Sequence, residues 1–157
     1  MGIRHLCERL TLHTHEDFIC VVTAIDNLAD QYAIVPPVIF KITLALDELV
    51  ANIFNYAFDG DQEPRVDVMV CIVKGYFYAR VSDTGRMFDL TEIAPPEVDV
   101  PLDERTRPVG GMGIHLVRQL MDSVTYYRYN DKNHVIICTK IDPETDEKGA
   151  GHGVDND

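Results

Sequence analysis

Residues 44–58 read Leu44-Ala-Leu-Asp-Glu-Leu-Val-Ala-Asn-Ile-Phe-Asn-Tyr-Ala-Phe58, and this stretch decides how the rest of the chain is interpreted. Good helix formers dominate it and neither Gly nor Pro interrupts it, so it is predicted to be helical. Glu48, Asn52 and Asn55 lie at i, i+4 and i+7, on one side of a largely apolar helix. The carboxylate can accept a proton, and the amides can hold a polar ligand or the water of a cation. A solvated helix face is the alternative interpretation of this pattern alone.

The composition is that of one soluble globular domain, with 157 residues, 46% apolar and 25% charged. The formal net charge of -12 argues against nucleic acid or an anionic membrane surface as a partner, because both bind through clustered Lys and Arg. No apolar run is long enough to predict a membrane span or a signal-peptide core. The four cysteines are scattered without a C-x-x-C pair, which favours reduced thiols in a cytoplasmic protein.

Hydrophobic periodicity and turn residues predict the remaining elements. The expected strands cover residues 3–13, 65–73, 76–82, 123–129 and 135–141, and the expected helices cover 16–33, 36–58 and 114–121. The second and third strands form a hairpin around Lys74-Gly75, and the last two form a hairpin around residues 130–133. Hairpin strands with helices beside them imply an α+β sandwich of two layers, with a mixed, largely antiparallel sheet covered by helices on one face.

Two segments are predicted to lie outside the regular core. Residues 86–112 carry four prolines and many acids, which is typical of a functional lid or of disorder. From residue 142 to 157 the chain is acidic and almost free of large apolar side chains, which predicts a disordered tail. The expected organisation is therefore one domain over residues 1–141, followed by this acidic tail.

Two glycine-bearing segments complete the candidate site. Asp83-Thr-Gly85 ends a core strand, where a carboxylate can accept a hydrogen bond from an exocyclic amine such as that of adenine. Gly110-Gly-Met-Gly113 precedes a helix, whose exposed N–H groups and positive end suit phosphates. The spacing fits neither a Walker P-loop nor a dinucleotide fingerprint, because no Lys follows the glycines and a loop precedes them. Each segment taken alone is also compatible with a plain turn.

The three elements in this order resemble the Bergerat-type ATP-binding fold, the fold of the histidine-kinase-like ATPases. Within that superfamily the chain is similar to the small anti-sigma-factor serine/threonine kinases of bacteria, the RsbW and SpoIIAB group. The likeness runs from about residue 3 to residue 141, and it is carried by Asp47-Glu-Leu-Val-Ala-Asn-Ile-Phe-Asn-Tyr-Ala-Phe58, Val81-Ser-Asp-Thr-Gly-Arg-Met-Phe-Asp89 and Gly110-Gly-Met-Gly-Ile-His-Leu-Val-Arg-Gln-Leu-Met-Asp122.

The resemblance implies a role for each polar residue of the central helix and the strand end. Asn52 would hold Mg²⁺ against the phosphates of ATP, with Asn55 beside it in the cofactor site. Glu48 would act as the general base. Asp83, supported by Gly85, would bind the amino group of adenine.

The resemblance also assigns roles to residues at the end of the lid. Gly110, Gly111, Met112 and Gly113 would wrap the phosphates. Arg107, with Arg105 as the fallback, would neutralise charge on the transferred phosphoryl group, although a solvent-facing lid arginine is the alternative for each.

The chain departs from the family pattern at three places. Met87 stands where the family's D-x-G-x-G motif has its second glycine, which could reshape the adenine side of the site. Tyr56 replaces a histidine that is common at that helix position. A hydroxyl near adenine on a late strand has no secure match, with Ile137 and Thr139 as the nearest candidates.

The implied activity is phosphorylation of a serine on a STAS-domain anti-sigma-factor antagonist by a Mg²⁺- and ATP-dependent protein kinase. The resemblance also allows a sigma factor as a second partner and leads us to expect a homodimer. The alternative is a non-catalytic ATP-binding module that holds a regulatory protein without turnover, and the intact Glu48 favours the enzyme. A two-component histidine kinase is disfavoured, because no helix that could carry a phospho-acceptor histidine is expected before the first strand.

Overall fold

A computed structural model of the chain describes residues 7–94, 101 and 112–142. The described elements are β1 (Cys7–Leu12), the short 3-10 helix η1 (His15–Asp17), α1 (Phe18–Tyr32), α2 (Pro36–Tyr56), β2 (Val66–Val73), β3 (Tyr76–Asp83), the 3-10 helix η2 (Leu90–Glu92), α3 (Met112–Leu120), β4 (Ser123–Tyr129) and β5 (Lys132–Lys140). The predicted order of strands and helices is therefore confirmed over these residues. None of the described helices combines the length and the apolarity needed to cross a bilayer.

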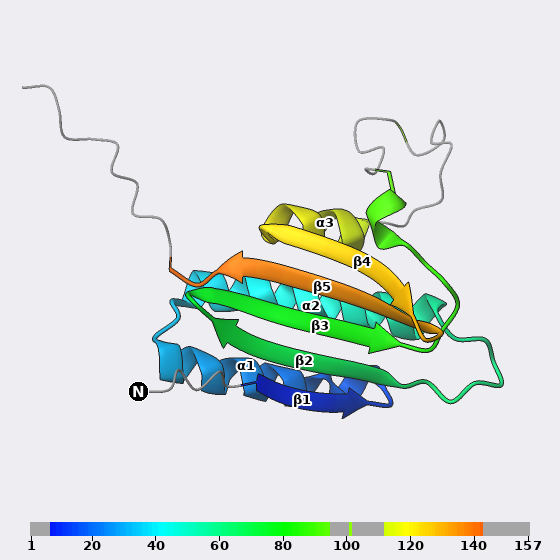
Figure 1. Cartoon of the computed structure of the whole chain (residues 1–157), viewed down its shortest axis with the longest axis horizontal. Coiled ribbons are helices and arrows are strands. Elements are labelled where there is room, and N and C mark those ends of the chain that lie inside the picture. Colours follow the sequence, from blue (N-terminus) through cyan, green and yellow to red (C-terminus); the bar gives the residue numbers. More distant parts are fainter. Residues whose placement is uncertain (1–6, 95–100, 102–111, 143–157) are drawn as a thin grey trace, which may run out of the picture.

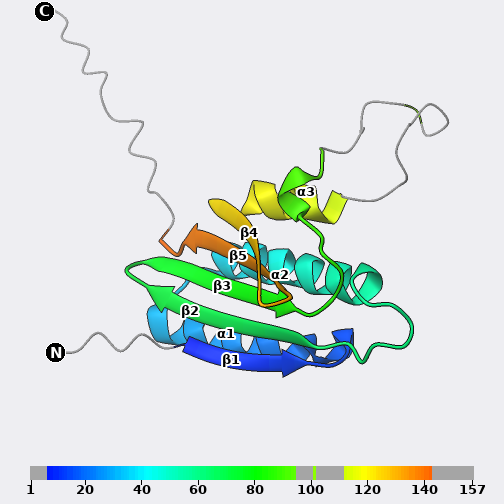
Figure 2. The same cartoon turned by 45° about the vertical axis from the view of Figure 1, so that its right-hand side comes forward.

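The strands form one sheet in the order β1-β2-β3-β5-β4, and every neighbouring pair in it is antiparallel. The sheet was expected to be mixed and largely antiparallel, and within the described residues it is fully antiparallel. Helices α1 and α2 lie side by side behind the sheet, and α3 lies beside them near the β4 edge (Figure 1). The turned view in Figure 2 shows the same two layers, with the outer face of the sheet left uncovered by helices. The two-layer sandwich is confirmed.

Side chains that alternate between the two faces of the sheet along each strand create the core. Side chains that point toward the helices are apolar and buried, as in β2 and β3 with Val66, Val68, Val70, Phe77, Ala79 and Val81. Both long helices meet them with apolar side chains at helical spacing, among them Val21, Ile25 and Leu28 of α1 and Ile42, Leu46 and Leu49 of α2. Burial of this surface is the main contribution that stabilises the fold.

Both hairpins are closed by two-residue turns with a left-handed backbone. Lys74 and Gly75 have φ of 49° and 80°, and Asn130 and Asp131 have φ of 49° and 56°. Such turns match the twist of the flanking strands. In the second hairpin the turn is shorter than the predicted loop over residues 130–133, so β5 already begins at Lys132. This earlier start places Asn133 in the sheet, directly opposite Asp83.

The prediction of four reduced cysteines is wrong for one pair. Cys7 of β1 and Cys71 of β2 face each other in the antiparallel register, with Cα atoms 4.3 Å apart, and they form a disulfide. Cys20 is exposed and Cys138 is buried, and both are free. The pair is 64 residues apart in sequence, so only the strand register brings the two cysteines together.

Several predicted features lie outside the described residues. These are Arg105, Arg107, Gly110, Gly111, most of the predicted lid, and the tail after residue 142.

Candidate functional site

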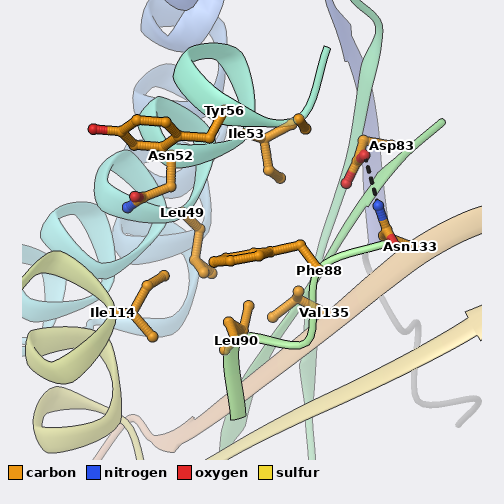
Figure 3. Close-up of a pocket in the computed structure, with 11 residues that line it drawn as sticks. Leu49, Asn52, Ile53, Tyr56, Asp83, Phe88, Leu90, Ile114, Asn133 and Val135 are labelled. Carbon is orange, nitrogen blue, oxygen red and sulfur yellow. Dashed lines mark hydrogen bonds between the residues drawn. The ribbon is translucent and has the colours of Figure 1, made fainter. Parts of the chain in front are cut away.

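The candidate site is a pocket between α2, α3 and the ends of β3 and β5 (Figure 3). Its walls are mainly apolar, and its polar groups are two amides and one carboxylate with a phenol at the rim. The lining residues are Leu49, Asn52, Ile53, Tyr56, Ala57, Asp83, Phe88, Leu90, Ile114, Asn133 and Val135.

A buried carboxylate lies at one end of this pocket. Asp83 is 4% exposed, and its Oδ1 accepts hydrogen bonds from the backbone N–H of Gly85 at 2.8 Å and from Nδ2 of Asn133 at 3.0 Å. Burial raises the pKa of Asp83, and the bonds from Asn133 and Gly85 and the charge of Arg128 oppose that rise. The second oxygen, Oδ2, makes no hydrogen bond to any described residue, so it can accept one from a ligand.

Asn133 is the part of the site that sequence reasoning missed. Besides Asp83, its Nδ2 donates to the carbonyl oxygen of Arg86 at 2.9 Å. Its Oδ1 accepts from the hydroxyl of Tyr126 and from a guanidinium nitrogen of Arg128, both at 2.9 Å. The amide is 4% exposed and fully bonded, so it holds Asp83 and the segment after it in place. Reading residues 130–133 as a loop hid this role, and a two-residue turn at Asn130-Asp131 is the signal that could have revealed it.

Gly85 allows the strand end to lie against the end of α2. A Cβ on Gly85 would come within 2.5 Å of the carbonyl oxygen of Ala57, a distance that no side chain tolerates. The next residue, Arg86, donates its backbone N–H to that same oxygen at 2.9 Å. The glycine is therefore required by a close backbone approach between the strand end and α2.

The polar stripe of α2 faces the start of α3. Asn52 donates from Nδ2 to the carbonyl oxygen of Glu48 at 2.6 Å, which leaves its Oδ1 free among the described residues. A Cβ on Gly113 would overlap the Glu48 carboxylate and lie 3.3 Å from Nδ2 of Asn52. The structure thus brings Glu48, Asn52 and Gly113 together, although the three come from two separate motifs. Asn55, in contrast, is exposed and does not line the pocket.

The segment after Asp83 contributes an aromatic ring. Phe88 reaches across the pocket toward Leu49 of α2, so a planar ligand that enters the pocket meets this ring (Figure 3). Met87, which replaces the second glycine of the family motif, is 70% exposed and does not line the pocket. Tyr56 does line it, at the rim, and is 57% exposed.

Neither late-strand candidate for a hydroxyl lies at the pocket. Ile137 pairs with Ala79 and Thr139 pairs with Phe77, both nearer the other end of β3 from Asp83. Thr139 is buried, and its hydroxyl has no hydrogen-bond partner among the described residues. The amide of Asn133 occupies the place beside the carboxylate where a hydroxyl was sought.

Arg118 of α3 holds the first part of the predicted lid, which sequence reasoning also missed. Its guanidinium donates to the carbonyl oxygen of Ile93 at 2.7 Å and to that of Leu90 at 2.8 Å. One side chain thereby links helix α3 to the segment around η2 (Leu90–Glu92).

The arrangement suits a flat heteroaromatic ring with an exocyclic amine and an anionic extension. The apolar walls can cover the ring, and the free Oδ2 of Asp83 can accept from the amine. At the other end Asn52 offers an amide oxygen and Glu48 a carboxylate, beside a helix start that favours negative charge. Those features fit a purine nucleotide with its phosphates toward α3.

Comparisons with known proteins agree with this geometry. The profile of the histidine kinase-like ATPase domain matches residues 14–139. The serine-protein kinase RsbW of Listeria monocytogenes serovar 1/2a is 32% identical over 111 residues, which are 68% of this chain and 69% of that protein. The serine/threonine-protein kinase BtrW of Bordetella bronchiseptica is 27% identical over 106 residues, which are 68% of this chain and 73% of that protein.

A solved structure supports the same fold. The RsbU and RsbW domains of a Mycobacterium tuberculosis protein superpose with a TM-score of 0.57 at 13% identity, over 85% of this chain and 32% of that chain. The match to the family profile covers the three helices, the sheet apart from β1 and the last residue of β5, and every described residue of the pocket. The chain therefore belongs to the histidine-kinase-like ATPase family, and within it to the RsbW-like group of serine-protein kinases.

Proposed function

We propose that the protein is an ATP-dependent serine/threonine protein kinase that phosphorylates a STAS-domain anti-sigma-factor antagonist. The observation that carries the proposal is the pairing of two groups in one pocket region. A carboxylate with a free oxygen lies at the base end, and a second carboxylate with a neighbouring amide oxygen lies at the phosphate end. Asp83 at the base end would recognise the nucleotide, and Glu48 with Asn52 at the phosphate end would carry out the phosphoryl transfer.

The adenine end would work through Asp83 and Gly85. The amino group of adenine donates to Oδ2 of Asp83, while Gly85 and Asn133 keep the carboxylate oriented. Leu49, Ile53 and Val135 cover the ring with apolar surface.

The phosphate end would carry the transfer. Asn52 would hold Mg²⁺ through its Oδ1, which is free among the described residues, and the ion would neutralise charge on the phosphates. Glu48 accepts the proton of the attacking serine hydroxyl, the serine oxygen forms a bond to the γ-phosphorus, and ADP leaves. Gly110, Gly111, Met112 and Gly113 would wrap the phosphates, and Arg107, with Arg105 as the fallback, would face the γ-phosphoryl group.

The regulatory setting is part of the same proposal. A sigma factor would be a second partner that competes with the phosphorylatable antagonist, and the active form would be a cytoplasmic homodimer. The relatives named serine-protein kinases support a kinase, and they leave the identity of the acceptor to experiment.

The test is a phosphotransfer assay with the full chain, labelled ATP, Mg²⁺ and the STAS-domain proteins of the same genome, with the phosphoserine located by mass spectrometry. Wild type is expected to label one of them. Glu48→Gln is expected to keep ATP affinity within a few-fold and to lose about 100-fold or more in transfer rate, the usual contribution of a general base. Asn52→Ala is expected to lose the Mg²⁺-dependent part of ATP affinity.

Asp47→Asn is the matched control. Asp47 is adjacent to Glu48, but its carboxylate pairs with Nε2 of His15 at 2.8 Å on another side of α2. This variant should transfer at the wild-type rate. Transfer that survives in Glu48→Gln would refute the assigned base. ATP binding and partner binding without any phosphoserine would show the non-catalytic module instead.

A further inference from the structure

Two side chains of β4 form a second layer of hydrogen bonds behind the carboxylate of the candidate site. Asn133 donates to Asp83 at 3.0 Å, as the dashed line in Figure 3 shows. On its other side, Oδ1 of Asn133 accepts from the hydroxyl of Tyr126 and from Nη1 of Arg128, both at 2.9 Å. Tyr126 and Arg128 are not among the described residues that line the pocket, so they act on a bound base through their neighbours.

The pairing of β4 with β5 brings these two donors to Asn133. Arg128 lies directly opposite Asn133 in the antiparallel register, and Tyr126 lies two residues earlier on the same face of β4. Tyr127 points to the other face, where its ring stacks on that of His134 with the centroids 4.7 Å apart. Since the two-residue turn fixes this register, the hairpin itself places both donors at the amide.

Arg128 and Asp83 together leave the amide of Asn133 one orientation. A guanidinium can only donate hydrogen bonds and an ionised carboxylate can only accept them, whereas a tyrosine hydroxyl can do either. Oδ1 of Asn133 must therefore face Arg128, and Nδ2 must face Asp83 and the carbonyl oxygen of Arg86. On the β4 side, Arg128 is the group that excludes the reversed amide, because Tyr126 adapts to both orientations.

Arg128 also holds the backbone of the strand end. Its Nη1 donates to the carbonyl oxygen of Gly85 at 3.3 Å, and Gly85 in turn donates its N–H to Oδ1 of Asp83 at 2.8 Å. The same guanidinium therefore supports both groups that bond to Oδ1, which leaves Oδ2 for the pocket. Burial raises the pKa of Asp83, and the charge of Arg128 is one of the contributions that oppose this rise and favour the ionised, accepting form.

We propose that Arg128, assisted by Tyr126, is a positioning residue that sets the preference of the pocket for a base with an exocyclic amine. The inference rests on the proposed recognition of adenine by Asp83. The two side chains hold the amide of Asn133 and the backbone of Gly85, and these hold the accepting oxygen of Asp83 toward the amine. A purine without the amine makes no such contact. Selectivity between the two purines therefore reports on the positioning, whereas a general weakening of the fold would affect both ligands.

The experiment compares two nucleotides by calorimetric titration of the full chain in the presence of Mg²⁺. One is ATP, and the other is the triphosphate of purine riboside, which lacks only the exocyclic amine. The variants are Arg128→Met, which removes the charge and the donors, Arg128→Lys, which keeps the charge and a donor, and Tyr126→Phe, which removes the hydroxyl. Tyr127→Phe and Arg65→Met are the matched controls, because Tyr127 stacks on the opposite face of β4 and Arg65 pairs with Asp67 on that same face of the sheet.

Wild type is expected to bind ATP roughly 10-fold or more tightly than the analogue, the ratio that one hydrogen bond to a charged acceptor supplies. Arg128→Met should reduce that ratio to about threefold or less, by weakening ATP binding while the analogue stays within about twofold of its wild-type affinity. Tyr126→Phe should reduce the ratio by a smaller factor, and Arg128→Lys should restore most of it. Both controls should keep the wild-type ratio.

An unchanged ratio in Arg128→Met, with the preference present in wild type, would overturn the inference and leave the proposed function intact. An equal loss of affinity for both ligands would also overturn it, because Arg128 would then only stabilise the fold. So would a loss of the ratio in either control, which would assign the effect to charge or to the sheet in general. A wild type that binds both nucleotides equally, or neither, would refute recognition of the amine by Asp83, and this inference with it.

Discussion

Replacing Asp83 by Asn tests whether this side chain recognises the base, because the substitution keeps the hydrogen bonds that hold the strand end in place. In the wild type Oδ1 of Asp83 is shared by Gly85 and Asn133, and Oδ2 faces the pocket. An asparagine at this position keeps Oδ1 for those two donors, because exchanging its oxygen and nitrogen would lose both bonds. Its NH₂ group therefore takes the place of Oδ2 and meets the amine of the base, donor against donor.

The cost of this mismatch follows from the contacts that are lost. A hydrogen bond to a charged acceptor contributes about 1.5–3 kcal/mol, and a donor left unpaired in a buried site costs about 1–3 kcal/mol more. A total near 3 kcal/mol or above corresponds to a roughly 100-fold rise in the dissociation constant for ATP. Calorimetric titration of Asp83→Asn with ATP and Mg²⁺ measures it.

The matched control is Asp67→Asn, which neutralises a carboxylate on the adjacent strand but on the other face of the sheet. Asp67→Asn should bind ATP as wild type does. If Asp83→Asn changed the dissociation constant by less than about threefold, a figure worth only about 0.6 kcal/mol, the assignment of Asp83 to the base would be refuted.

The same variant should alter the pH dependence of stability. Burial raises the pKa of Asp83 in the folded state above the value near 3.9 of an unfolded aspartate. The folded state then binds the proton more tightly, so wild-type stability falls as pH rises from about 4 through the raised pKa. The free energy of unfolding of wild type, measured by urea denaturation without nucleotide, should fall relative to that of Asp83→Asn over this range. Parallel curves for the two proteins would contradict the direction of the pKa shift.

Two further substitutions test close contacts elsewhere. In Gly113→Ala the new methyl group meets the end of the flexible Glu48 side chain, which can rotate away, so the free energy of unfolding should change by less than about 1 kcal/mol, whereas ATP affinity should fall because the methyl group and the displaced carboxylate occupy the phosphate end of the site. Gly60→Ala, where a Cβ meets nothing within 4 Å, should leave both unchanged in the same titration and denaturation series, and equal behaviour of the two variants would contradict the contact. Cys71→Ser opens the cross-strand disulfide and should lower the free energy of unfolding in non-reducing buffer by about 2–4 kcal/mol. Cys20→Ser, at an exposed free thiol, should not change it, and a Cys71→Ser protein as stable as Cys20→Ser would show that the crosslink adds nothing.

Local sequence patterns were sufficient to predict most of the fold and half of the candidate site. The stripe of Glu48 and Asn52 follows from helical spacing, and the closeness required at Gly85 and Gly113 is marked by the absence of a side chain. The fold class follows from the alternation of the strands and the periodicity of the helices. None of these inferences depends on where distant segments meet.

Features that depend on strand register or on the path of a loop could not be predicted from the sequence. Asn133 becomes the partner of Asp83 only because β5 begins three residues earlier than its apolar pattern indicates. Cys7 meets Cys71 through the pairing of β1 with β2, which no local signal reports. Phe88 enters the pocket because of the route of the segment after β3, and hydrophobicity alone did not distinguish it from exposed Met87.

The tight turn at Asn130-Asp131 makes the nucleotide pocket sensitive to the length of a hairpin on the surface. Neighbouring residues of a strand face opposite sides of the sheet, so shifting β5 by one position would exchange Asn133 for His134 beside Asp83. The amide would then lie on the open face and an imidazole would enter the pocket. We therefore expect that an insertion or deletion of a single residue in this turn abolishes ATP binding more reliably than many substitutions inside the pocket. Among related chains, hairpin length should be as tightly restricted as the glycine motifs.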